Sequence, residues 1–144
     1  SVQKFIENFK GEFISFPPEE ISLPRSVNGL DKYFDSKIIY TKGTPIHVKG
    51  ALLYNHMLNK KGLSKKYPLI QEGEKLKFTY LKKPNPIDDT VISYPNRLPP
   101  EFDLDKYVDY DLQFEKAFLE PLKSITDVIG WGLEHKSTLE DFFG

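Results

Sequence analysis

Prolines limit where regular elements can run in this chain. The sequence contains 11 of them, and each lacks a backbone N–H and fits only certain positions of a helix or strand. The first helical pattern ends before Pro17 and Pro18, and we expect a loop over residues 19–25. The pattern starts at residue 1 without a recognisable cap, so we expect the tail of a longer helix. Its apolar residues recur at steps of three and four: Val2, Phe5, Ile6, Phe9, Phe13 and Ile14.

A second helix and a hairpin are expected in the middle of the chain. Thr44 is a suitable N-terminal cap, Pro45 suits the first helical position, and Gly62 suits the C-terminal end. Apolar and polar residues alternate over 75–80, which predicts a half-buried strand with a basic outer face. A turn rich in proline follows, and residues 91–94 predict the second strand of an antiparallel hairpin.

The last long element is expected to be a helix from about Asp103 to Ile129. Pro121 cannot donate to the carbonyl of Ala117, so we expect a kink or a break there. The apolar stripe of this helix consists of Phe114, Phe118, Leu122, Ile125 and Ile129. With 144 residues, the chain suits one domain. The elements together predict an α+β fold, mainly helical with a small antiparallel β-hairpin.

The charged residues are divided unevenly along the chain, although the formal net charge is only −1. Residues 1–24 carry two Lys and four Glu, which gives −2. Residues 25–83 carry 13 Lys or Arg and four Asp or Glu, which gives +9, and residues 84–144 carry five and 13, which gives −8. A basic segment of this kind often binds a polyanion. The acidic part can pair with it, face another protein or be solvated.

Residues 42–49 are the first candidate binding element. A glycine and a cap residue lead into a helix start there, with a lysine on either side. A helix N-terminus offers unpaired N–H groups and positive potential to a phosphate, and such a surface grips a nucleic-acid backbone without reading sequence. The alternative is an ordinary capped helix with solvated lysines. The candidate DNA-binding residues are Arg25, Lys32, Lys42, Gly43, Thr44, His47, Lys49, Lys75 and Lys77, with Lys37 as an extension.

The second candidate element is the C-terminal tail. Leu139 is followed at the third and fourth positions by Phe142 and Phe143. One helical turn would therefore present all three side chains to a hydrophobic pocket of a partner. The alternative is that the two phenylalanines fold back into the core.

No self-contained active site is visible in the sequence. It has no Walker-type loop, no G-x-G-x-x-G or G-x-S-x-G motif, no cysteine and no run of 18 apolar residues that would span a membrane. Three acidic pairs could hold Mg²⁺ or act as acid and base, but their places after a turn and at a helix start favour a structural role. They are Asp88-Asp89, Asp103/Asp105 and Asp109/Asp111. We predict no catalytic and no metal-binding residues; a metal-dependent hydrolase built on Asp88, Asp89 and His47 is the minor alternative.

Several motifs resemble, in the same order, those of one family. A lysine followed by Pro-x-His-(Ile/Val)-(Arg/Lys)-Gly-x-Leu-x-Tyr corresponds here to Lys42, Pro45, His47, Val48, Lys49, Gly50, Leu52 and Tyr54. The later matches are Asn85-Pro86, Tyr94-Pro95, Phe118 to Leu122, and Ser137 to Gly144. Over nearly its whole length, the chain resembles the thumb and C-terminal tail of a family-B replicative DNA polymerase of the T-even bacteriophage type.

The resemblance implies a thumb-like domain over residues 1–133 and a flexible tail with a clamp-binding motif over 134–144. In this family the thumb holds primer–template duplex DNA through sequence-independent backbone contacts, and the tail docks on the sliding clamp. Leu139, Phe142 and Phe143 would make the clamp contact. The location implied is the host cell cytoplasm.

The catalytic parts of the family have no counterpart in this sequence. The Asp-Thr-Asp signature of the palm is absent, as are finger and exonuclease motifs. No activity is therefore expected of the chain alone, and Mg²⁺ is expected in the palm of the remaining polymerase polypeptide. An excised fragment and a split-gene product remain equally open. The alternative from another class is a non-enzymatic protein-interaction domain whose acidic half neutralises its basic half and leaves no DNA surface.

Overall fold

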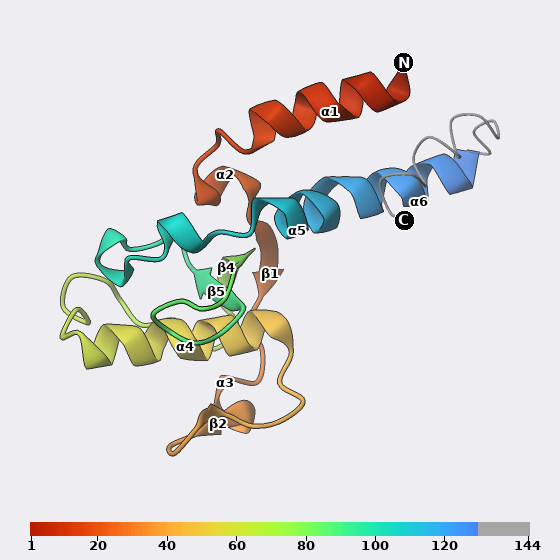
Figure 1. The fold of residues 1–144 in the computed structure, drawn as a ribbon. Helices are drawn as coiled ribbons and strands as arrows, with labels where there is room; N and C mark the ends of the chain where they lie inside the picture. Colours follow the sequence, from red (N-terminus) through yellow and green to blue (C-terminus); the bar gives the residue numbers. More distant parts are fainter. Residues whose placement is uncertain (130–144) are drawn as a thin grey trace.

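The computed structural model describes residues 1–129 as helices arranged around a small antiparallel sheet (Figure 1). This confirms the α+β class predicted from the sequence. The elements in chain order are α1 (Val2–Phe13), α2 (Pro18–Ile21), β1 (Leu23–Ser26), α3 (Leu30–Tyr33), β2 (Phe34–Asp35), β3 (Ile39–Tyr40), α4 (Ile46–Lys60), β4 (Lys75–Tyr80), β5 (Val91–Tyr94), two 3₁₀ turns (Pro100–Phe102 and Asp105–Tyr107), α5 (Tyr110–Phe114), a π-helical turn (Glu115–Leu119) and α6 (Glu120–Ile129).

The main sheet has three strands in the order β1-β4-β5. The predicted hairpin is confirmed, because β4 and β5 pair in antiparallel register with Phe78 opposite Ser93. The loop predicted over residues 19–25 is wrong, since α2 and β1 occupy most of that segment and β1 pairs with β4. Pro24 is tolerated within β1 because this strand lies at the edge of the sheet.

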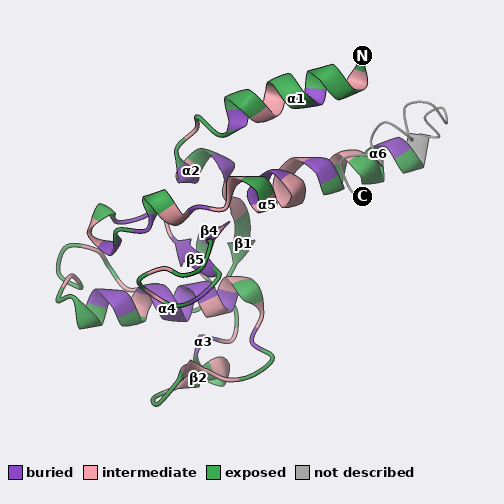
Figure 2. Cartoon of the chain, in the orientation of Figure 1, coloured by how far each residue is buried: buried purple, intermediate pink, exposed green. Residues whose placement is uncertain are grey.

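Helix α4 packs against β5 and supplies much of the core, as the buried residues coloured purple along much of it in Figure 2 show. Its C-terminal end is as predicted, because Gly62 follows it with a φ of 67°. The predicted role of Thr44 is wrong. Pro45 takes the N-cap position, and the Thr44 hydroxyl donates instead to the carbonyl oxygen of Thr41 at 2.6 Å.

One residue of the predicted outer face of β4 lies in the core. Thr79 is fully buried, and its hydroxyl oxygen is 2.5 Å from the hydroxyl oxygen of Tyr94. Burial raises the pKa of Tyr94 to about 12. The strict alternation of exposed and buried residues therefore stops before the end of β4.

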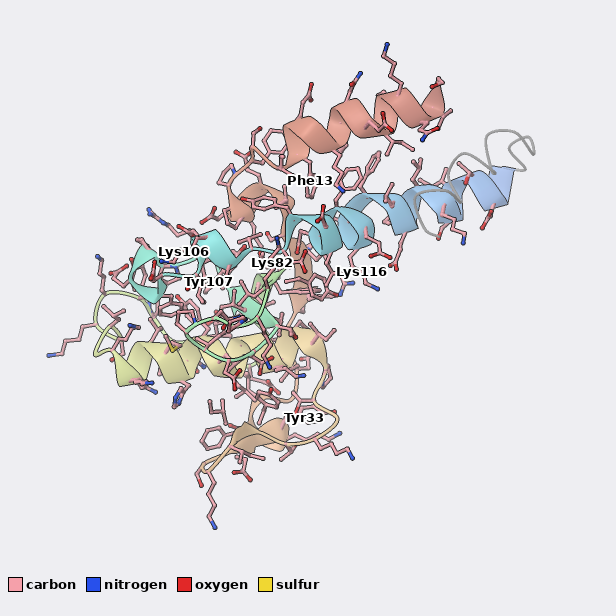
Figure 3. All side chains as sticks on the ribbon, viewed as in Figure 1. Phe13, Tyr33, Lys82, Lys106, Tyr107 and Lys116 are labelled. Atoms are coloured by element: carbon pink, nitrogen blue, oxygen red, sulfur yellow. The ribbon has the colours of Figure 1, made fainter. Side chains whose placement is uncertain are left out.

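Helix α1 runs beside the α5–α6 stretch, and both project away from the sheet (Figure 1). Aromatic rings join them: the ring centroids of Phe9 and Phe118 are 4.6 Å apart. Phe13, labelled in Figure 3, is buried at the end of α1 nearest the sheet. The phenylalanines spaced along α1 thus pack against a helical stretch that lies about 100 residues later in the chain.

Two predicted helix starts are corrected by observed caps. The Ser1 hydroxyl oxygen accepts a hydrogen bond from the Lys4 N–H at 3.3 Å, so the expectation of an uncapped start is wrong. The last helix does not start near Asp103, which has a φ of 55° and ends a 3₁₀ turn. Asp109 caps it instead, because its Oδ1 accepts from the Leu112 N–H at 3.0 Å.

The interruption predicted at Pro121 takes the form of a π-helical turn just before it. The Glu120 N–H donates to the carbonyl oxygen of Glu115, five residues earlier, so regular α-helical bonding stops ahead of the proline. Of the predicted apolar stripe, Phe114 is buried but Ile125 is 57% exposed. The side chain of Ile129 lies outside those described.

A buried glutamine ties α5 to the sheet. The Gln113 side chain is fully buried. Its Nε2 donates to the carbonyl oxygen of Ile21 at 2.8 Å, and its Oε1 accepts from the Tyr80 N–H at 2.9 Å. One amide therefore satisfies backbone groups from α2 and β4 at once.

Candidate nucleic-acid interface

The start of α4 has the open backbone donors that the sequence predicted. No side chain of the described part of the chain caps it, and the first intrahelical bond runs from the Lys49 N–H to the Pro45 carbonyl oxygen at 2.8 Å. The N–H groups of residues 46–48 precede that bond. Gly43 has a φ of 86°, and a Cβ placed on it would meet no atom of residues 1–129 within 4 Å. The loop leading into the helix is therefore accessible and requires glycine for its conformation.

Three of the predicted residues lie together beside this helix start: Arg25, His47 and Lys75. Arg25 of β1, Ser26 and Lys75 of β4 line a shallow depression of about 260 Å³. His47 of α4 lies close enough to Arg25 for its pKa to be lowered, first by partial burial and then by the arginine charge. A hydrogen bond with the Ser26 backbone acts in the opposite direction. Strand β1, missed from the sequence, is what joins these groups.

Arg25 is held in place by two further contacts. Its Nη1 donates to the carbonyl oxygen of Pro24 at 2.7 Å, and its guanidinium carbon lies 5.7 Å from the centroid of the Phe78 ring. The side chain as a whole remains exposed. A guanidinium oriented over a ring and open to solvent suits a phosphate ligand.

Lys77 and Lys32 do not belong to the same group. Lys77 is half-buried, and its Nζ lies 3.4 Å from the carbonyl oxygen of Glu19 in α2. Lys32 is exposed on α3, with its Nζ 5.1 Å from the ring centroid of Tyr33, which Figure 3 labels below α4. The candidate DNA-binding residues named from the sequence therefore lie on separate parts of the surface.

Lys49 lies on a tyrosine that the sequence analysis did not single out. Its Nζ is 5.0 Å from the ring centroid of Tyr40, and the Tyr40 hydroxyl donates to Oδ2 of Asp89. Burial, with this hydrogen bond second, raises the pKa of Tyr40 to about 12. Asp89 is 9% exposed, and its Oδ1 also accepts from the Thr90 N–H at 2.7 Å. No local motif marks this cluster, because Asp89 is 49 residues from Tyr40 in the sequence.

Within the part of the chain that the structure describes, most basic residues of the 25–83 segment form no ion pair with an acidic side chain. Within residues 1–129, the ion pairs of this segment are those of Lys66 with Glu101 at 2.9 Å and of Lys83 with Asp88 at 3.4 Å. The other 11 of its 13 cations have no such pair with the described residues. Self-neutralisation, which the interaction-domain alternative requires, is therefore limited.

The acidic pairs do not form a metal centre in the described part of the chain. Among residues 1–129, no group of three or more His, Cys, Asp or Glu side chains is placed to hold a metal ion. Asp89 is bound to Tyr40, and Asp88 is exposed and paired with Lys83. His47 lies instead beside Arg25. The geometry thus gives no support to the hydrolase alternative.

Two predictions cannot be placed on this structure. Leu139, Phe142 and Phe143, the predicted clamp contact, lie outside the described residues, as does the proposed tail over 134–144. Across residues 1–129, no helix is both long and apolar enough to cross a bilayer.

Comparison with known proteins adds a relationship that the geometry alone does not show. No family model matches the chain. It is 29% identical over 148 residues to the DNA-directed DNA polymerase of Enterobacteria phage T4, an alignment that covers all of this chain. The chain is homologous to a short stretch of a phage DNA polymerase. The polymerase of Escherichia phage RB69 is 32% identical over 103 residues, or 69% of this chain. The chain spans only 16% and 11% of these two relatives.

Proposed function

We propose that the chain is the C-terminal part of a DNA-directed DNA polymerase and holds primer–template duplex DNA as its thumb domain. The observation that carries this proposal is the similarity of the whole chain to part of a phage polymerase. The thumb assignment is supported by motif order in the sequence and by the helical fold around a small hairpin.

The surface around the start of α4 is the proposed DNA contact. Arg25, His47 and Lys75 meet there, and the exposed Lys42 lies in the loop that leads into the helix. These groups suit phosphate oxygens and offer no arrangement that would distinguish one base from another. Binding would therefore be independent of sequence and would weaken steeply with salt.

The remaining parts of the proposal concern other polypeptides. The tail over 134–144 would dock on the sliding clamp through Leu139, Phe142 and Phe143. Catalysis, with its Mg²⁺, would belong to the palm of the remaining polymerase polypeptide, since residues 1–129 offer no metal-binding cluster. The whole would act in the host cell cytoplasm, as polymerase homology suggests.

The DNA contact is tested by fluorescence anisotropy with a labelled primer–template duplex at 50 and 200 mM salt. We expect affinity to fall with salt, with a slope in log–log coordinates of about −0.9 for each phosphate contact. Arg25→Ala with Lys75→Ala removes two proposed contacts and should make that slope shallower by about two. Lys4→Ala with Lys106→Ala removes the same charge away from this surface and should leave the slope near that of the parent.

Three results would reject the DNA contact. One is the absence of binding at 50 mM salt, and another is an affinity that is the same at 50 and 200 mM salt. The third is an equal effect of the two double variants, which would show that only net charge matters.

The clamp contact is tested by pull-down with the sliding clamp of the same replication system. Phe142→Ala with Phe143→Ala should abolish capture, because both aromatic rings proposed to enter the partner's hydrophobic pocket are lost. Phe5→Ala with Ile14→Ala removes two exposed apolar side chains elsewhere and should preserve capture. Undiminished capture by the tail variant would reject the clamp contact without affecting the DNA proposal.

A further inference from the structure

A groove lies on the side of α4 that faces away from the main sheet. Figure 1 shows α3 and β2 beneath α4, with β4 and β5 above it. The groove has a volume of about 500 Å³, within the range of ligand sites. Its walls come from α3, the β2–β3 hairpin, α4 and the segment over residues 69–72.

The walls of the groove are fixed by hydrogen bonds that do not depend on a ligand. The Asn55 side chain on α4 donates to the Ile70 carbonyl oxygen at 3.0 Å and accepts from the Ile70 N–H at 2.8 Å. The Glu72 carboxylate accepts from the N–H groups of Gly29 and Leu30 at 2.8–3.1 Å. Both sides of the groove are therefore preformed, which lowers the entropic cost of binding.

The groove has an apolar floor and one exposed aromatic wall. Leu30 and Leu52 are buried beneath it, and Leu69 is half-buried at its side. Phe34 is 56% exposed although it lines the groove. An exposed phenylalanine beside a preformed apolar hollow is typical of a surface that anchors a partner side chain.

The charge of the groove is opposite to that of the surrounding segment. Residues 25–83 contain only four acidic residues, and three of them line the groove: Asp31, Asp35 and Glu72. None of the described lining residues is Lys or Arg. The Asp31 carboxylate makes no hydrogen bond or ion pair with residues 1–129, whereas Oδ1 of Asp35 accepts from the Lys37 and Ile38 N–H groups. An acidic hollow repels nucleic acid and selects a cation.

We propose that this groove binds a short peptide segment of another protein that carries an arginine beside a leucine-like side chain. The apolar side chain occupies the floor formed by Leu30 and Leu52. The guanidinium lies against the Phe34 ring and between the carboxylates of Asp31 and Asp35. A cation–π interaction with the ring and charge-assisted hydrogen bonds with the carboxylates both stabilise it there. This site is separate from the proposed DNA contact and does not depend on it.

The probe is the peptide acetyl-Leu-Arg-Leu-amide, titrated into the ¹⁵N-labelled chain and followed by backbone NMR shifts. We expect saturable shifts confined to residues 30–36 and 69–72 and to the α4 residues that line the groove. Acetyl-Leu-Glu-Leu-amide, which has the same apolar side chains and the opposite charge, should produce shifts at least fivefold smaller at equal concentration.

Variants of the chain distinguish peptide binding in the groove from a general effect of net charge. Asp31→Asn with Phe34→Ala should weaken the arginine peptide about fivefold or more, and both sites are exposed, so the spectrum should remain folded. Glu12→Gln removes one exposed charge on α1 and should leave peptide affinity unchanged. Duplex DNA affinity should be the same or slightly higher in the groove variant.

Three results would overturn the proposal. They are absence of binding at millimolar peptide, equal binding of the glutamate peptide, and shifts that spread over residues outside the groove. Concentration-dependent line broadening at the groove without peptide would assign it instead to a second copy of the chain.

Discussion

Gly50 of α4 lies directly against Ser93 of β5. A Cβ placed on Gly50 would come within 2.7 Å of the Ser93 backbone nitrogen, closer than side-chain carbons approach a backbone in proteins. The Ser93 hydroxyl also donates to the carbonyl oxygen of His47 at 2.9 Å. This contact fixes α4 on the sheet, and with it the position of the helix start beside Arg25.

Gly50→Ala is expected to destabilise the domain. Overpacking costs about 1–3 kcal/mol, and the better helix propensity of alanine offsets about 1 kcal/mol of it. A net loss of up to about 2 kcal/mol in the free energy of unfolding should therefore appear in urea denaturation. Gly11→Ala in α1 is the matched control, because its Cβ meets no atom of residues 1–129 within 4 Å. It should stabilise the domain by about 0.5–1 kcal/mol. Equal shifts for the two variants would contradict the close α4–β5 contact.

The contrast between α4 and β1 shows what local patterns can predict. Local patterns mark α4, β4 and β5, which end at Lys60, Tyr80 and Tyr94, and Gly62 and Pro95 follow closely after α4 and β5, so the sequence predicts these elements well. Strand β1 contains a proline and exists only because β4, about 50 residues later, pairs with it. Its pairing is also what brings Arg25 beside His47 and Lys75. The composition of the basic surface was therefore predictable, but its division into separate groups was not.

Thr79 and Asp89 show that the burial of a single residue can also escape prediction from its local sequence. A strand pattern treats threonine as an outward residue, yet the Tyr94 hydroxyl gives it a buried partner. Asp89 follows a proline turn, which favours exposure, but Tyr40 from another hairpin binds its carboxylate. In both cases the hydrogen-bond partner comes from a distant segment, and the neighbouring residues in the sequence do not indicate it.

Gln113→Leu is expected to cost more than ordinary core substitutions. It leaves the Ile21 carbonyl and the Tyr80 N–H without their side-chain partner, and each unsatisfied buried group costs about 1–3 kcal/mol. A loss of about 2–6 kcal/mol should appear as a lower urea midpoint. Gln3→Leu on exposed α1 should change stability by less than about 0.5 kcal/mol. A Gln113 variant as stable as this control would show that the amide does not join α5 to the sheet.

The stability of the domain should depend on Glu101 in acid. Hydrogen bonds from Lys66 and then Tyr67 lower the pKa of Glu101 from 4.5 to about 2. Because the folded-state pKa is the lower one, the stabilisation is present above pH 4.5 and is lost as the pH falls toward 2. Glu101→Gln should therefore be less stable than the parent at pH 6, and the difference should shrink at pH 3 and below.

The matched control for Glu101 is Glu12→Gln, since the Glu12 carboxylate makes no hydrogen bond or ion pair with residues 1–129. Urea midpoints at pH 6, 4 and 3 for all three proteins give the comparison. A difference in urea midpoint between the parent and Glu101→Gln that stays constant over this pH range would mean that the carboxylate charge does not contribute to stability.

The Lys49–Tyr40–Asp89 cluster allows stability and DNA binding to be separated. Tyr40→Phe removes the hydroxyl that binds the nearly buried Asp89 carboxylate, so unfolding free energy should fall by about 1–2 kcal/mol. It keeps the ring 5.0 Å from the Lys49 Nζ, so duplex affinity should remain close to that of the parent. Lys42→Ala with Lys49→Ala should do the reverse, leaving stability within about 0.5 kcal/mol and making the salt slope shallower by about two.

Urea denaturation and duplex anisotropy on the same preparations measure both quantities. If Tyr40→Phe weakens duplex binding as much as the lysine pair does, the ring acts through the position of the whole β3 segment and not as a platform for Lys49. If the Lys42→Ala, Lys49→Ala variant binds duplex as the parent does, the start of α4 is not part of the DNA surface. The proposed contact is then limited to Arg25 and Lys75, because these two side chains reach the same depression from neighbouring strands without the helix.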